Sequence, residues 1–169
     1  MPTRALGQST TDQFIQVAST AQSIEFKDVQ TTVGSIVFND VPTALAWDET
    51  QVIFNESGKY VLTASAHLIR VDGVSHLNYY FWPEIDTGSG FAQFSNFVTT
   101  EGLASLDQDE VHPVEIACPI IDVAAGDKIR FRMEADLLRN SGIVFVDNTK
   151  ADPNFPGTAP SFQFTAIKI

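Results

Sequence analysis

The sequence has almost no cysteine and no long apolar run. Cys118 is the single cysteine among 169 residues, so no disulfide can form within the chain and the redox compartment stays open. Its apolar context, IACPII, predicts a buried thiol. No apolar stretch of about 20 residues exists for a membrane span, and residues 1–14 lack the apolar segment of a signal peptide. We therefore expect a complete product of the cytoplasm with no membrane partner.

Positive charge is also scarce. Ten Lys and Arg stand against 21 Asp and Glu, which gives a net charge of −11. Because a phosphate backbone is itself negative, this balance argues against nucleic acid as a partner. Four of the ten cations lie close together, at Lys128, Arg130, Arg132 and Arg139. We interpret them as a solvated strand edge, with a docking patch for an acidic neighbour as the alternative.

No segment shows the apolar period of a helix, whereas β-forming residues separated by turn signals run throughout. The patterns predict ten strands, at Phe14–Val17, Ser23–Phe26, Ile36–Phe38, Gln51–Phe54, Lys59–Ile69, His76–Ile85, Phe91–Val98, Val111–Asp122, Lys128–Ala135 and Ser161–Lys168. Ten short strands indicate an all-β sandwich or jelly roll. We expect residues 1–12 to form a polar N-terminal arm and residues 13–169 to form one domain.

The clearest alternation follows the turn Asn-Glu-Ser-Gly at residues 55–58. The even-numbered residues from Tyr60 to Leu68 are apolar and predict a core-facing side. Val61, Thr63 and Ser65 lie on the other side and are small and mixed, which suits contact with another protein surface. In the strand at 128–135, Ile129, Phe131 and Met133 are expected to face inward and the cations outward.

Three motifs occur in an order that resembles the tumour necrosis factor (TNF) and complement globular-head superfamily. They are FNESGKYVLTASAHL, VAAGDKIRF and the closing strand SFQFTAIKI. The resemblance implies a ten-stranded TNF-like jelly roll that forms compact homotrimers. It also implies which residues meet at the threefold axis: Val61, Thr63, Ser65, Ile116, Cys118, Gln163 and Ile167.

Trimeric jelly rolls of this type also serve tailed bacteriophages as capsid decoration, or cement, proteins. The chain resembles them in its short arm and in lacking disulfides and a signal peptide. The resemblance implies a virion protein on the capsid surface that stabilises a phage head, with itself and the major capsid protein as partners. Two alternatives are a soluble complement-like head that binds a glycan or a protein, and a phage fibre head.

Residues that could carry chemistry are few. His67, His76 and His112 lie in different predicted strands, and no nucleophile, zinc or phosphate-binding motif occurs, so we expect no enzyme and no cofactor. Oxygen ligands occur close together at Asp107, Asp109 and Glu110. They have two interpretations, a calcium site or a solvated loop.

The segment HLNYYFWPEI, residues 76–85, is apolar on both of its faces. One face must belong to the core, which leaves Tyr80 and Trp82 on the other face. These two rings form a possible ligand or partner surface, since a sugar ring can stack on them. The alternative is that the neighbouring hairpin, residues 92–98, or the proline-rich loop covers them.

Overall fold

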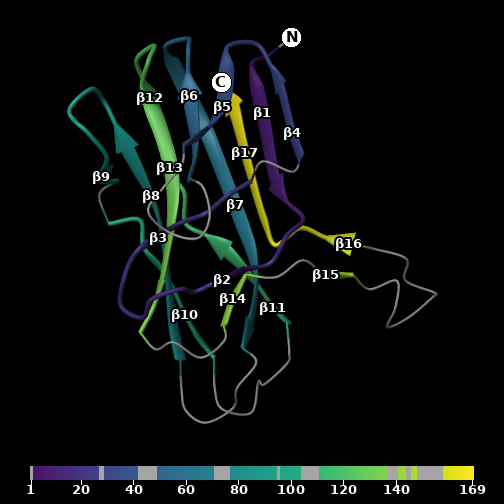
Figure 1. Cartoon of the computed structure of the whole chain (residues 1–169). Coiled ribbons are helices and arrows are strands. Elements are labelled where there is room, and N and C mark those ends of the chain that lie inside the picture. The colour runs from purple at the N-terminus through teal and green to yellow at the C-terminus, as the bar shows by residue number, and fades with distance from the viewer. Residues whose placement is uncertain are drawn as a thin grey trace.

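Figure 1 shows the computed structural model of the chain. The structure describes residues 2–26, 29–41, 49–70, 77–94, 96–103, 111–136, 141–143, 146–147 and 158–169. Every regular element in these ranges is a β-strand, which confirms the predicted all-β fold class. The same ranges contain no helix that is long and apolar enough to cross a membrane.

Two antiparallel sheets form the layers of a sandwich (Figure 1). Sheet A runs in the order β2-β14-β7-β17-β1-β4, and β11 and β12 pair with the remaining edge of β7. Its strands are β1 (Arg4–Ser9), β2 (Gln13–Phe14), β4 (Val29–Val33), β7 (Gly58–Arg70), β11 (Val111–Ile116), β12 (Ile120–Val123), β14 (Ser141–Ile143) and β17 (Phe162–Lys168). The long strand β7 is therefore central, with partners along both edges.

Sheet B runs in the order β10-β8-β13-β6-β5, with β9 paired to β8 and β3 paired to β13. Its strands are β3 (Gln22–Ser23), β5 (Ile36–Val41), β6 (Glu49–Phe54), β8 (Leu77–Asp86), β9 (Ala92–Gln93), β10 (Thr99–Leu103) and β13 (Lys128–Ala135). A separate two-stranded ribbon joins β15 (Val146–Asp147) to β16 (Thr158–Ala159). The predicted alternation of β13 is confirmed, because Ile129, Phe131 and Met133 are buried.

Phenylalanine rings hold the two sheets together. The ring centroid of Phe131 on β13 lies 5.3 Å from that of Phe162 and 5.1 Å from that of Phe164, both on β17. Phe26, in the connection before β4, lies 5.7 and 6.0 Å from the same two rings. All four rings are fully buried. Burial of one such side chain contributes roughly 1.5–3 kcal/mol, so this cluster fixes sheet A against sheet B.

The prediction of a polar N-terminal arm is wrong for residues 4–9. These residues form β1, which pairs with β17 along one edge and with β4 along the other. Its inward residues are small, namely Ala5, Gly7 and Ser9. A Cβ at Gly7 would collide with the rings of Phe26 and Phe38. The aromatic rings therefore fill the core space over β1, and its own side chains supply little apolar signal.

Candidate functional site

The register of β7 and β17 brings five of the seven predicted contact residues onto the outer face of sheet A. Val61 lies opposite Ile167, and Ser65 lies opposite Gln163. Thr63 lies between them on β7 and is exposed. The alternate residues of both strands are buried in the core. At residues 61–65 of β7 and 163–167 of β17, the two strands thus present a single outward face of uncharged side chains.

Ile116 and Cys118 do not belong to that face. Ile116 is 5% exposed and points into the core opposite Ala64, and the outward position next to it is Glu115. Cys118 packs against the core, and burial raises the pKa of its thiol to about 12. Both predictions fail because they treat residues 111–122 as one strand, whereas residues 117–119 separate β11 from β12.

This separation brings Ile120 to the outer face of sheet A. Ile120 lies opposite Val61 and is 62% exposed, and Ile167 on the other side of Val61 is 41% exposed. The three side chains make an apolar row across β12, β7 and β17. Sequence reasoning missed Ile120, although Pro119 is a signal that a strand begins there, because proline favours the first position of a strand.

A shallow hollow of about 430 Å³ extends the outer face of sheet A over β1 and β17. Its lining residues are Arg4, Ala5, Leu6, Thr31, Gln163, Thr165 and Ile167. Arg4 is the only charged residue among them. The contribution of β1 and β4 was missed by the sequence prediction, which gave residues 4–9 and 29–33 no strand.

Charged side chains on the outer face of sheet A lie at its margins in the described strands. Glu115 lies on β11 at the edge of the sheet, and Asp122 on β12 pairs with Lys59 at 3.9 Å. Both members of that pair are exposed, so the pair contributes little to stability. The outward residues farther in are Leu6, Gln8, Thr63, Ser65, Gln163 and Thr165. Arg4 lies opposite Ile167 at the end of β1 and is exposed. A partner can cover the central part of this face without burying an unpaired charge, provided that Arg4 stays in water or is paired.

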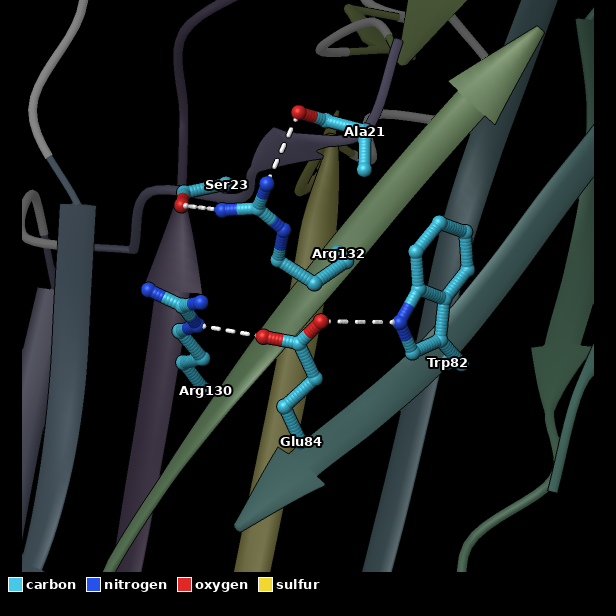
Figure 2. A network of polar contacts seen from close by, with 6 residues as sticks. All are labelled: Ala21, Ser23, Trp82, Glu84, Arg130 and Arg132. Carbon is cyan, nitrogen blue, oxygen red and sulfur yellow. Dashed lines mark hydrogen bonds and ion pairs between the residues drawn. The ribbon is translucent and has the colours of Figure 1, made fainter. Parts of the chain in front are cut away.

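The outer face of sheet B is charged, and several of its charged side chains make contacts within the chain (Figure 2). Arg130 Nε donates to Glu84 Oε2 at 2.6 Å, and Trp82 Nε1 donates to Glu84 Oε1 at 3.2 Å. Arg132 reaches the other way and donates to Ser23 Oγ at 2.7 Å (Figure 2). The cations of β13 therefore face outward as predicted, and Lys128, Arg130 and Arg132 each contact a neighbouring residue.

Asp86 closes the turn that follows β8. Its Oδ1 accepts hydrogen bonds from the backbone N–H groups of Gly88 and Gly90, each at 2.8 Å. Both glycines have positive φ, 107° and 101°, which favours glycine there. These two N–H donors, with Lys128 at 3.6 Å, hold the pKa of Asp86 below its usual value. The carboxylate is thus stabilised in its charged form.

The other predicted site residues fall in different places. Asp107, Asp109 and Glu110, the candidate calcium ligands, lie outside the described residues. Within the described ranges, no three His, Cys, Asp or Glu side chains gather to hold a metal ion. Tyr80 and Trp82 are partly exposed on the outer face of sheet B.

Comparisons with known proteins support the fold. No family model and no curated protein sequence matches the chain. Among solved structures, that of Eiger TNF from S. frugiperda is similar, with a TM-score of 0.51 over 100% of this chain and 94% of that chain. Its sequence identity is 10%, so the likeness shows the fold alone. The chain has a TNF-like jelly-roll fold.

Proposed function

We propose that the chain is a structural virion protein that forms homotrimers through the outer face of sheet A and decorates a virus capsid, most like a bacteriophage head. The observation that supports this proposal is the outer face of sheet A, whose side chains are mostly uncharged between its margins, with Arg4 beside Ile167 as the charged residue of the hollow. It carries an apolar row at Ile120, Val61 and Ile167 and an adjoining hollow over β1 and β17.

The outer face of sheet A suits a ring of three copies because its two ends differ from each other. The apolar row with the projecting Ile120 lies toward β12, whereas the hollow lies toward β1. A projection on one copy can therefore enter the hollow of the next copy, which is a head-to-tail contact. Such contacts close into a ring when a whole number of equal rotations from one copy to the next completes one full turn.

The capsid role is favoured by the charged surface that lies outside the proposed trimer contact. Sheet B turns a charged surface outward, on which Arg130 is paired with Glu84 and Arg132 bonds Ser23, and each copy carries a net charge of −11. A high charge of one sign keeps particles apart in solution. We propose the capsid surface as the location, the major capsid protein as the partner, and a stabilising rather than a catalytic role.

Cosedimentation with capsid shells tests the proposal. The purified protein is mixed with shells assembled from candidate phage capsid proteins, and the shells are then pelleted. The proposal predicts saturable binding in multiples of three copies and shells that resist heat better when decorated. The Val61→Arg variant, which should not form trimers, serves as the control and should stay in the supernatant.

Two results would contradict the proposal. Binding of single copies would contradict the trimer, and trimers that bind no shell would contradict the capsid role. In the second case, the fibre head and the complement-like binding head become the better assignments for the same fold.

A further inference from the structure

A second hollow, of about 340 Å³, lies on the outer face of sheet B, on the opposite side of the sandwich from the proposed trimer contact. It is lined by Tyr80, Trp82, Gln93, Val98 and Glu134. Its volume is near the lower end of the range for small-ligand pockets, roughly 300–1,000 Å³. The hollow is therefore of a size to take one small ring.

The neighbouring hairpin flanks this hollow and does not cover it. β9 and β10 pair with β8 in the plane of sheet B, with Gln93 opposite Glu84 and Thr100 opposite Tyr80. Val98, which is 40% exposed, forms the side wall next to Trp82. In the described residues, the hairpin thus lies beside the two aromatic rings, and Val98 contributes to the wall of the hollow. Residues 148–157 of the proline-rich loop, which is the other alternative cover, lie outside the described residues.

The two aromatic rings have no ring or cation partner among the described residues. The guanidinium of Arg130 lies 4.1 Å from the centroid of Phe91, and that of Arg132 is directed toward Ser23. The indole N–H of Trp82 is already bound to Glu84, which fixes the plane of the ring. Tyr80 and Trp82 therefore offer a partly exposed aromatic platform, on which no described residue places a ring or a cation.

Two polar groups complete the hollow. Glu134 lies opposite Tyr80 on β13 and makes no hydrogen bond or ion pair within the described part of the chain, and the same holds for the amide of Gln93. A carboxylate accepts hydrogen bonds only, whereas an amide both donates and accepts. Together they can satisfy hydroxyl groups, which need both kinds of partner.

We propose that this hollow binds a neutral pyranose ring, such as the terminal hexose of a glycan. The C–H face of the sugar would stack on Trp82 and Tyr80, and its hydroxyl groups would bind Glu134 and Gln93. A small organic cation would use the rings and the carboxylate but would leave the Gln93 amide without a role. The site does not depend on the trimer, because its residues lie on the other sheet.

The indole N–H signal of Trp82 in ¹H–¹⁵N NMR spectra tests the proposal in the full chain. The Trp82→Phe variant assigns this signal, since the sequence has two tryptophans. The probes are methyl β-D-galactopyranoside, methyl α-D-mannopyranoside and tetramethylammonium chloride. We expect at least one glycoside to shift the signal with a dissociation constant on the order of 1 mM, as ligands of this size allow.

Two variants examine the contacts without touching the core. Glu134→Gln keeps the shape of the side chain, and Tyr80→Ala removes one ring, so each should weaken glycoside binding by about tenfold. Val37→Ala, on the same outer face but at the far edge of the sheet on β5, should leave binding unchanged. Unchanged melting temperatures show that the variants fold.

The proposal is overturned if neither glycoside moves the Trp82 signal at concentrations up to about 50 mM, well above the expected dissociation constant. It is also overturned if tetramethylammonium moves the signal and the glycosides do not, which would indicate a cation site. If the Glu134→Gln and Tyr80→Ala variants both bind the glycoside as tightly as the wild type does, the sugar binds elsewhere and the proposal is overturned as well.

Discussion

The two sheets share one core but differ on their outer faces. On sheet B, outward charges meet within the chain, as Arg130 and Glu84 do at 2.6 Å. On sheet A, the outward side chains between the margins are uncharged, and Ile120 and Ile167 remain 62% and 41% exposed. Charges paired in this way are satisfied in a single copy, whereas Glu134 in the hollow of sheet B has no partner among the described residues. A face that keeps aliphatic side chains in water gains stability when it is covered.

The largest expected effect comes from a charge placed on the outer face of sheet A. Val61→Arg and Ile167→Arg should abolish association, because a buried unpaired charge costs about 3–5 kcal/mol. Size-exclusion chromatography with light scattering measures the change. Val37→Arg is the matched control on sheet B, where the wild-type side chain is 46% exposed. An unchanged mass for both sheet A variants would contradict the assigned contact.

Substitutions at two neighbouring residues of β1 distinguish the inner side of sheet A, which faces the core, from its outer side. Gly7→Ala should lower the free energy of unfolding by about 1–3 kcal/mol, because the new methyl group collides with the rings of Phe26 and Phe38. Leu6→Asp, on the outward side, should weaken association and leave the fold of the chain intact. Urea unfolding and elution volume report the two effects. The reverse outcome would mean that β1 faces the other way.

A smaller effect is expected on sheet B. Glu84→Gln removes the ion pair between Glu84 and Arg130. The side chain of Arg130 is 20% exposed and that of Glu84 is 14% exposed. We expect a loss of about 1 kcal/mol of stability in urea unfolding, with no change in mass. Asp122→Asn is the control, since its pair with Lys59 is exposed and should contribute almost nothing. Dissociation of the Glu84→Gln variant would show that sheet B takes part in association.

The smallest expected effect is the pH dependence of the stability that Asp86 contributes. Because the pKa of Asp86 is held below its usual value in the folded chain, its charged form adds stability at neutral pH. That contribution is lost as the pH falls below about 4, where the unfolded chain binds the proton first. Thermal unfolding of wild type and Asp86→Asn should therefore differ at neutral pH and converge in acid. A constant difference at every pH would contradict this role.

The sequence predicts the strands that alternate large apolar residues with polar ones. β7, β13 and β17 are of this kind, and five of the seven predicted contact residues follow from β7 and β17. β1 was missed because its inward residues are small and its apolar residue, Leu6, faces outward. Ile120 was missed because its direction depends on the break at residues 117–119, and alternation within one strand carries no information about such a break.

Hydroxyl-radical footprinting of the wild-type protein tests the central claim most directly, because it measures which outer face is covered. Ile167, Ile120 and Val37 are 41%, 62% and 46% exposed in the single chain, so equal access would give similar oxidation. We predict that Ile167 and Ile120 are strongly protected while Val37 is oxidised, and that Val61→Arg removes the protection. Oxidation of all three to a similar extent in the wild type would contradict the claim that the outer face of sheet A is where the copies meet.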